Sequence, residues 1–330
     1  ASTVAWETRT FRQFKLQKLV YSTIKSEFTL CAQMAVRCVG KVADAYKLDR
    51  KTRREFRPLG SIAYDDRIIS FKPGNVVSLW ALPGRQFVPF VCGDYQRRFL
   101  PHRQGEIDLV YHGGTFYLNV ICEAEEPPVG PTEDFLGVDL GVVNIATDSD
   151  GNVYSGAKVE LNRRIFAHRR RNLQRKGTRA ARRKLRTIKG GQARFQKDTN
   201  HVISKAIVAT AERTSRGIAL EDLRGIRQRV TARRCQRARL ANWGFYQLRS
   251  FVEYKARLAG VPVVLVDPRN SSRTCPACGC IDKANRPDQA TFLCISCGFS
   301  GLADAVAAGV IRARAAVMRP MVASNGTAVA

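Results

Sequence analysis

The sequence lacks any apolar run of the roughly 18 residues that a membrane-spanning helix needs, and it has no signal-peptide pattern. It is also poor in acids, with 28 Asp and Glu against 55 Lys and Arg. The missing apolar run argues against a membrane-spanning protein. The scarcity of acids leaves a net charge of +27, which predicts a polyanionic partner.

Disulfide-like spacing is missing as well. Four of the ten cysteines form one tight cluster, and the other six are scattered, at Cys31, Cys38, Cys92, Cys122, Cys235 and Cys280. A chain of 330 residues, 45% of them hydrophobic, can bury its own cores without a disulfide frame. We therefore expect reduced thiols in a cytosolic protein. The chain begins at Ala1 rather than Met, so we also expect residues to be missing from its start.

The first part of the chain changes from helical to strand-like patterning. From residue 19 to 46, apolar residues recur with a period near 3.6, which indicates helix. Between Leu59 and Cys122, short β-rich segments such as "VVSLWAL" and "TFYLNVICE" are separated by Gly and Pro. They predict an antiparallel sheet or a small barrel. The acidic, proline-rich "EAEEPPVGPTED" of residues 123–134 is typical of a linker.

The second part alternates strands and helices, which indicates an α/β layer fold. "FLGVDLGVVNIATDSDGNVYSG" predicts two strands around a turn at "DSDGN", and "RGIALEDL" and "VPVVLVD" predict two more. "NWGFYQLRSFVEYKARLAG" has helical spacing from Trp243, and Gly260 is placed to end the helix. The small, polar tail after Arg319 is expected to fray.

The cysteine cluster has the spacing of a metal site. "CPAC" and "CISC" are separated by 15 residues, and glycine follows the second cysteine of each. Four thiolates in two such pairs predict one tetrahedral, structural Zn²⁺ site with no open position. The alternatives are two redox pairs or chance clustering, and Cys280 is interpreted as a bystander. The predicted zinc ligands are Cys275, Cys278, Cys294 and Cys297.

A strongly basic segment covers residues 161–197, with 15 Lys or Arg and no acid. A solvated helical face normally mixes both signs, because like charges one turn apart repel. A phosphate backbone would relieve this repulsion, so we expect contact with nucleic acid rather than with solvent alone. The expected contacts are Arg163, Arg164, Arg169, Arg170, Arg171, Arg175, Lys176, Arg182, Arg183 and Lys184.

Three carboxylates stand in apolar surroundings. Asp139 lies within a predicted buried strand, Glu221 ends another, and Asp304 begins a small-residue helix in "GLADAVAAGVI". A buried charge costs several kcal/mol unless it is paired. If the three acids meet at one end of a sheet, Mg²⁺ would relieve their repulsion and could hydrolyse a phosphodiester. Spacing alone leaves open whether they meet. Asp222 is interpreted as outward-facing, and Asp148 and Asp150 as turn residues.

Four motifs, in order, resemble the RuvC-type nuclease of TnpB proteins, which insertion sequences encode and which are related to small type V CRISPR effectors. They are "GVDLGVVNIA", "IALEDLRGI", the segment from "NWGFYQL" to "CPACG", and "CISCGFSGLADAVAAGVI". The resemblance is close over about residues 135–315 and loose over residues 1–130. It implies an RNA-guided DNA endonuclease that cuts double-stranded DNA beside a short motif. Its partners would be a guide noncoding RNA and target DNA, and it would act as a monomer with that RNA.

The resemblance also implies roles for residues. Asp139, Glu221 and Asp304 would be the catalytic acids and would bind two Mg²⁺ ions. The four cysteines would form a zinc ribbon that helps to load target nucleic acid. Val306 departs from the family, which often has Asn there, and this puts one contact of the site in doubt. The usual first barrel strand is missing, and the helical lobe is short.

The implied architecture is multidomain, of α/β and β class, with an RNase H-like (RuvC) nuclease domain and an inserted zinc ribbon. A helical recognition lobe would cover residues 1–58, and a β-barrel wedge domain residues 59–130. The nuclease domain would cover residues 131–270 and resume with its last helix at 299–318, around a ribbon at 271–298 and before a flexible tail at 319–330. Two alternatives are a catalytically silent RNA-guided repressor and an RNA-independent transposase or resolvase. The presence of all three acids argues against the first, and the excess of basic residues argues against the second.

Overall fold

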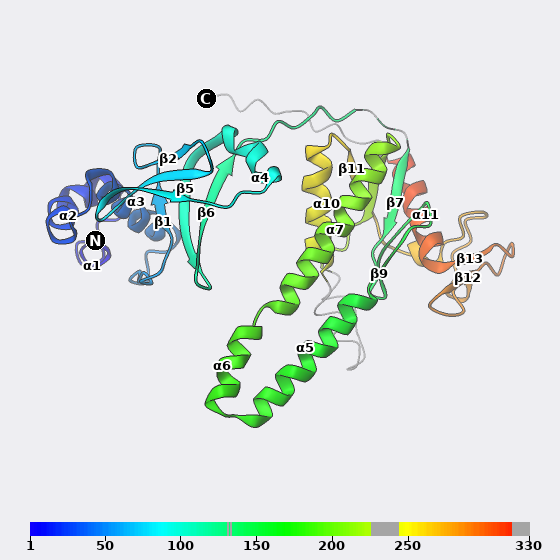
Figure 1. The fold of residues 1–330 in the computed structure, drawn as a ribbon. Coiled ribbons are helices and arrows are strands. Elements are labelled where there is room, and N and C mark those ends of the chain that lie inside the picture. The colour runs from blue at the N-terminus through cyan, green and yellow to red at the C-terminus, as the bar shows by residue number, and fades with distance from the viewer. Residues whose placement is uncertain (131, 133, 226–243, 319–330) are drawn as a thin grey trace. The chain divides into compact units, whose positions relative to one another are not determined.

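The computed structural model describes residues 1–330 except 131, 133, 226–243 and 319–330 (Figure 1). It contains two compact units, Ala1–Ala124 and Glu125–Ala330. Their boundary lies inside the predicted linker. The predicted helix start at Trp243 and the predicted tail lie outside the described residues. In the described part of the chain, no helix is long and apolar enough to cross a membrane.

The first unit begins with helices. The predicted helical spacing of residues 19–46 is confirmed, but it belongs to two helices rather than one. Thr29 ends the first of them in the left-handed region, at φ 49°, and the chain turns there. Leu16, Val20, Val39 and Tyr46 pack between the helices. The three helices are α1 (Ser2–Glu7), α2 (Gln13–Phe28) and α3 (Ala32–Leu48).

Two three-stranded antiparallel sheets follow, in the orders β1-β5-β6 and β2-β3-β4. The prediction of antiparallel sheet is confirmed. No closed barrel forms among the described residues, so the predicted wedge barrel is not found. Sequence patterning missed one short strand and one helix in this region. The elements are β1 (Ile62–Tyr64), β2 (Ile69–Lys72), β3 (Val76–Ala81), β4 (Gly84–Pro89), α4 (Asp94–Phe99), the 3₁₀ helix η1 (Leu100–His102), β5 (Arg103–His112) and β6 (Thr115–Cys122).

The second unit is built on a five-stranded sheet of order β11-β10-β7-β8-β9. The first three strands of that order are parallel, and β8 and β9 are antiparallel to their neighbours. The turn at "DSDGN" connects β8 to β9, so the segment "FLGVDLGVVNIATDSDGNVYSG" supplies three strands rather than two. The strands are β7 (Phe135–Asp139), β8 (Asn144–Asp148), β9 (Val153–Ser155), β10 (Gly217–Glu221) and β11 (Val263–Val266).

Helices cover both faces of this sheet, which makes the unit an α/β layer structure (Figure 1). Side chains alternate along a strand, so residues two apart share a face. Leu136 and Leu220 face a core formed with α7 (Gly191–Arg213) and α10 (Phe245–Leu258). Phe135 and Ala219 face the other core, formed with α11 (Ala303–Val317). β7 and β10 are buried on both faces, which explains their near-continuous apolar sequences.

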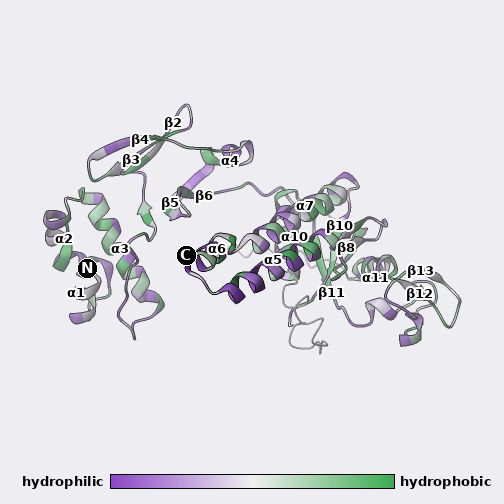
Figure 2. Cartoon of the chain, turned by 60° about the horizontal axis from the view of Figure 1, so that its bottom comes forward, coloured by the Kyte–Doolittle hydropathy of each residue, from purple (hydrophilic) through white to green (hydrophobic). Residues whose placement is uncertain are grey.

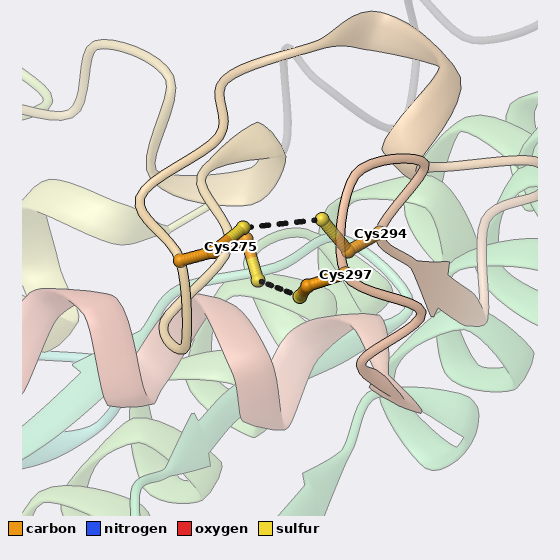
Figure 3. Close-up of side chains that lie close together, drawn as sticks. Cys275, Cys294 and Cys297 are labelled. Carbon is orange, nitrogen blue, oxygen red and sulfur yellow. Dashed lines mark hydrogen bonds between the residues drawn. The ribbon is translucent and has the colours of Figure 1, made fainter.

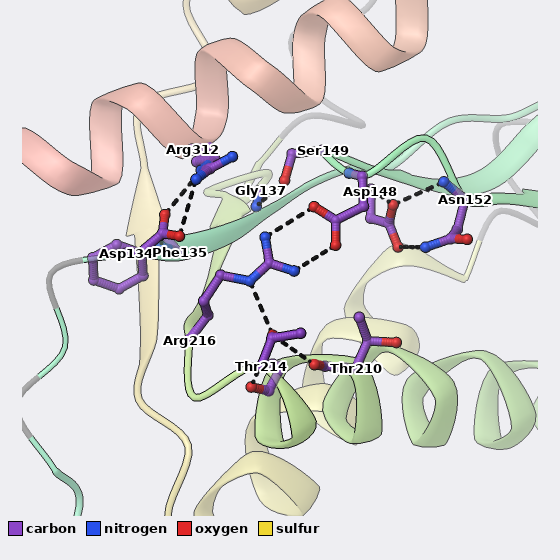
Figure 4. Close-up of polar contacts among 12 residues, drawn as sticks. Asp134, Phe135, Gly137, Asp148, Ser149, Asn152, Thr210, Thr214, Arg216 and Arg312 are labelled. Carbon is purple, nitrogen blue, oxygen red and sulfur yellow. Dashed lines mark hydrogen bonds and ion pairs between the residues drawn. The ribbon is translucent and has the colours of Figure 1, made fainter.

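Gly137 lets α11 lie directly on β7. A Cβ at this position would stand 2.1 Å from the carbonyl oxygen of Ala308 and 2.6 Å from the backbone nitrogen of Arg312. Only glycine permits such a close approach of two backbones. Arg312 also forms two hydrogen bonds of 2.9 Å with Asp134, just before β7 (Figure 4). These contacts fix the helix against the strand along its length.

Arg216 makes a second cross-link at the amino end of β7 and β10. Its guanidinium pairs with both carboxylate oxygens of Asp150, in the β8–β9 turn, and donates to the hydroxyl of Thr214 (Figure 4). Residue Arg216 directly precedes β10, so the pair ties β10 to the hairpin. Ion pairs thus cross-link the amino end of the sheet.

Two helices extend the second unit away from the sheet. α5 (Ala157–Lys176) and α6 (Arg179–Ile188) form a hairpin that continues into α7 (Figure 1). No residue of α5 is buried, and the helix is mostly hydrophilic (Figure 2). Gly177 ends it in the left-handed region, and the Thr178 hydroxyl caps α6 by accepting from Ala181.

A small cysteine-containing lobe lies between β11 and α11. Its short elements are the 3₁₀ helices η2 (Ser271–Arg273) and η3 (Lys283–Asn285) and the paired strands β12 (Thr291–Leu293) and β13 (Ser300–Leu302). Its core contains Phe292 and two of the cysteines, and Val306 of α11 closes that core. We call residues 271–298 the ribbon; β13, which pairs with β12, follows it directly.

Candidate active site and metal centre

Two of the three predicted acids end neighbouring parallel strands. Asp139 is the last residue of β7 and Glu221 the last of β10, and the register pairs Leu220 with Val138 directly before them. Adjacent strands lie about 4.8 Å apart, so the two carboxylates begin from neighbouring positions. Both residues continue the face that carries Phe135 and Ala219. They therefore point to the side of the sheet that α11 covers.

Asp304 reaches the same place from the helix. It lies in the first turn of α11, which Gly137 holds against β7. The negative charges of Glu221 and Asp304 both act on Asp139. The structure thus brings together three acids that are far apart in the sequence. This convergence is what spacing alone left open.

The acids are electrostatically strained. Burial raises the pKa of Asp139 to about 7, and the charges of Glu221 and Asp304 add to the effect. Burial also raises the pKa of Glu221, although the Ser271 hydroxyl donates a hydrogen bond to it and opposes the shift. A nearby cation would favour the ionised forms of Asp139 and Glu221.

Two neighbours of Asp304 were missed by sequence reasoning. Asn144 of β8 donates its side-chain N–H to Oδ2 at 2.9 Å, and Arg286 of the ribbon approaches Oδ1 to 3.4 Å. Arg286 also lowers the pKa of Asp139. Neither residue belongs to a spacing pattern. A polar residue beginning a strand, in "GVVNIA", was the only available signal for Asn144.

The acid group has the ligand chemistry of a magnesium site. Carboxylate oxygens are the ligands that Mg²⁺ prefers, and it retains waters for phosphate oxygens. Thr147, opposite Asp139 in register, is buried, and its hydroxyl has no hydrogen-bond partner in the described structure. The oxygens of the three acids do not all lie within 4.8 Å of one another.

The four predicted zinc ligands form a compact cluster, and their sulfurs all lie within 4.8 Å of one another. The sulfurs of Cys275 and Cys297 are 3.6 Å apart and those of Cys278 and Cys294 are 3.5 Å apart (Figure 3). In a tetrahedral zinc–thiolate site the sulfurs lie about 3.8 Å apart. The cluster can therefore hold a metal ion. Cys280 is not one of the four.

Glycines complete the two knuckles. Gly279 and Gly298 have φ of +73° and +74°, and each donates its backbone N–H to the carbonyl of the first cysteine in its pair. The left-handed conformation turns the chain back sharply, which aims both thiols of a pair at one point. The glycine after each CxxC is thus required by the turn.

The other acids near the motifs have structural contacts. Asp148 is buried and accepts hydrogen bonds from the backbone of Asp150 and Asn152, as expected of a turn residue. Asp222 turns outward and pairs with Arg224 and Arg249, which lower its pKa to about 2. Asp222 therefore faces away from the carboxylate group that Glu221 joins.

The predicted nucleic-acid contacts lie on the basic hairpin, which we define as α5 and α6. Arg163 and Arg164 both pair with Glu160, one turn earlier, so these two cations are partly neutralised within the protein. Arg170 donates to Gln192 of α7. Seven of the predicted residues lie on α5 and three on α6, namely Arg163, Arg164, Arg169, Arg170, Arg171, Arg175 and Lys176, then Arg182, Arg183 and Lys184.

Two family models match this chain, one from the end of the first unit into the second and one wholly within the second. Residues 119–224 match the OrfB_IS605 family, described as a probable transposase. Residues 245–311 match the Cas12f1-like TNB domain. The first match contains Asp139 and Glu221, and the second contains Asp304 and the four cysteines. The models therefore cover every acid and every thiol of the candidate site.

Relatives include the TnpB-like protein MJ0751 of Methanocaldococcus jannaschii, 28% identical over 71% of this chain and 88% of that protein. The CRISPR-associated endodeoxyribonuclease Cas12f1 of Sulfoacidibacillus thermotolerans is 33% identical over 57% of this chain and 48% of that protein. The putative RNA-guided DNA endonuclease InsQ of Escherichia coli K12 is 27% identical over 58% and 52%. The chain thus spans about half the length of the latter two relatives.

Among solved structures, a Cas12f1–sgRNA–target DNA complex is similar at 15% identity and a TM-score of 0.43, covering 94% of this chain and 92% of that one. The resemblance carried by the four sequence motifs is confirmed by the two family models and by the named relatives. The chain is similar to TnpB-like proteins and to Cas12f endonucleases, and two of its segments match the probable-transposase and TNB models.

Proposed function

We propose that this chain is an RNA-guided DNA endonuclease, encoded by a transposable element, that cuts double-stranded DNA beside a short motif. The observation that carries the proposal is the meeting of Asp139, Glu221 and Asp304 at the carboxyl end of the sheet. Three charged acids in one half-buried place are costly for folding alone. They are the ligands that phosphodiester hydrolysis needs.

Two Mg²⁺ ions bound by these acids would activate a water molecule and stabilise the leaving oxygen of the phosphodiester. Asn144 orients Asp304 through its 2.9 Å hydrogen bond, and Ser271 orients Glu221. Arg286, on the other side of Asp304, carries a positive charge into the site and can meet a phosphate oxygen. The chain's own residues thus fix the acids from both sides.

The sheet supports an RNase H-like, RuvC-type assignment for the nuclease domain. In chain order its strands lie fifth, fourth, first, second, third, and the second is antiparallel to the first. In this arrangement the first and fourth strands are neighbours, so their last residues share one edge. We assign residues 131–270 and 299–318 to this domain, and residues 1–58 and 59–130 to the helical recognition and wedge regions.

We further propose that the four cysteines bind one structural Zn²⁺. The sulfur separations fit a closed tetrahedral site, and Cys278 and Cys297 are exposed while Cys275 and Cys294 are buried. The ribbon has a small core, so the metal would supply much of its stability. Arg286 belongs to the ribbon and pairs with Asp304, so the ribbon contributes a side chain to the acid site.

The guide RNA would be bound mainly through charge. The net charge of +27 and the exposed α5 support a long polyanionic partner. Contacts from Arg and Lys to phosphates give affinity without reading sequence. Sequence would instead be read by pairing between guide and target, while the protein reads backbone shape and a short flanking motif.

The deciding experiment is to sequence the nucleic acid that copurifies with the full chain and then to assay cleavage with and without it. We expect an element-derived RNA, no specific double-strand cutting by RNase-treated protein, and restored cutting at guide-matched sites when the RNA is returned. Cutting of a defined site by RNA-free protein would instead support a transposase or resolvase. Guide-dependent binding without cutting would support a silent repressor.

A further inference from the structure

Asn285 is a completely buried polar residue in the ribbon, with no exposed surface. Its amide nitrogen donates to the carbonyls of Arg273 at 2.9 Å and Cys280 at 3.2 Å, and its oxygen accepts from the backbone N–H of Ile295 at 3.0 Å. One side chain therefore joins the approach to the first knuckle, the end of that knuckle and the second knuckle. All of these bonds go to backbone, so they fix the course of the chain.

The next residue is Arg286, whose guanidinium approaches Asp304. Arg286 also donates to the carbonyl of Gln289 at 2.8 Å and pairs with Asp304 at 3.4 Å. It lies in the 15-residue loop between the two cysteine pairs, where only short elements form. A loop with so little regular structure holds a side chain in one position only where a buried group fixes its backbone. Asn285 is the buried polar anchor directly beside Arg286.

We propose that Asn285 is a positioning residue, which acts through Arg286 to hold a positive charge against Asp304. The inference rests on the proposed function only for its cleavage readout. The structural part of the proposal is that the amide side chain of Asn285 fixes the loop that places the Arg286 guanidinium beside Asp304. The cysteine cluster fixes the two knuckles, and Asn285 transmits their position to the loop that carries Arg286.

The alternative is that Asn285 merely stabilises the ribbon. The two roles predict opposite changes in the affinity of the acids for a metal ion when Asn285 is replaced. The guanidinium of Arg286 repels a divalent cation at Asp304, because like charges a few ångströms apart oppose each other. Releasing Arg286 should therefore strengthen metal binding at the acids. General damage to the ribbon would loosen the acids and weaken metal binding.

The test uses the full-length, RNase-treated chain with its zinc retained. Mn²⁺ binding is followed by electron paramagnetic resonance, counting only the binding that Asp139→Ala abolishes. We expect Asn285→Ala and Arg286→Gln each to tighten Mn²⁺ binding by about fivefold, as removal of a partly exposed charge would. The double variant should be no tighter than Arg286→Gln alone, because both changes remove the same interaction.

Cleavage by the RNA-loaded chain gives a second readout. Asn285→Ala should cut at the reduced rate of Arg286→Gln, with target binding and zinc content unchanged. Thr274→Val is the matched control, since its hydroxyl bonds locally to the Asn270 carbonyl. That variant should behave as wild type in Mn²⁺ binding and in cleavage.

Weaker or unchanged Mn²⁺ binding by a zinc-loaded Asn285→Ala variant would overturn the proposal, as would additive effects in the double variant. If Asn285→Ala loses zinc, the milder Asn285→Ser carries the test. Loss of zinc by both variants would also overturn it, because Asn285 would then serve the ribbon itself. If wild type fails to cut DNA, the proposed function fails, but the Mn²⁺ result still decides this inference.

Discussion

Asn144 donates a hydrogen bond of 2.9 Å to Asp304 across 160 residues of sequence, joining β8 to the first turn of α11. This contact bears on Val306, where the motif resemblance led us to expect Asn. Val306 is buried in the ribbon core with Phe292 and does not face the acids. In this chain the amide beside Asp304 therefore comes from the sheet.

Replacing Asn144 with Ala should lower the cleavage rate about tenfold, since a hydrogen bond to a charged group contributes about 1.5–3 kcal/mol, part of which orients Asp304. Single-turnover cleavage and target binding should be measured together, and binding should not change. Asn152→Ala is the control, because Asn152 lies on the same hairpin but bonds to the turn residue Asp148. A wild-type cleavage rate in Asn144→Ala would remove Asn144 from the site.

Asp139→Ala and Glu221→Gln should each abolish cleavage and leave guide and target binding nearly intact, because the metal serves the chemical step. Gel-based cleavage at ordinary Mg²⁺ and a binding assay would establish both points. Asp222→Asn, one residue from Glu221 but paired outward with Arg249, should retain activity. Persistent cutting by a purified Asp139 or Glu221 variant would refute the assignment of the acids.

Asp139→Asn should stabilise the Mg²⁺-free protein at pH 8 and have little effect at pH 4. Burial raises the folded-state pKa of Asp139 from 3.8 to about 7, so the folded protein holds a proton that the unfolded chain has lost between those values. Stability therefore falls as pH rises through this window, by about 2–4 kcal/mol. Urea unfolding at both pH values, with zinc retained, measures the difference. Equal stability of variant and wild type at pH 8 would contradict the claim that ionised Asp139 destabilises the metal-free fold.

Metal analysis should find close to one zinc per chain. Cys275→Ser or Cys294→Ser should lower that value and impair cleavage more than guide binding. Cys280→Ser is a matched control, because Cys280 lies in the ribbon but outside the group of four sulfurs. Iron in place of zinc, or full activity after loss of metal from the cysteines, would argue against a structural zinc site.

Replacing Arg169, Arg170 and Arg171 with Gln should flatten the salt dependence of RNA binding by up to about three phosphate contacts. All three lie on the exposed part of α5. The corresponding Lys variants keep the charge and should keep the slope. If the Gln variants bind RNA with an unchanged slope, α5 touches little of the RNA.

Local patterns in the sequence determined much of the secondary structure. Apolar spacing located α2, α3, α10 and most of the strands, because a helix or strand must present one face or both to a core. The spacing of the cysteines predicted their cluster, since both ligand pairs and their turns lie within a short stretch. The same local reasoning missed the short elements α1, β1, α4, β12 and β13 and the long helix α7. It also could not say whether β2 to β6 close into a barrel.

Only the tertiary structure decided which distant residues meet. The sequence identified Asp139, Glu221 and Asp304 as unusual, but their convergence depends on strand order, register and the packing of α11 on Gly137. Asn144 and Arg286 follow no periodic pattern, so no local signal separated them from other polar residues. Contacts across many residues are set by how buried faces pack together, and this packing is a property of the whole fold.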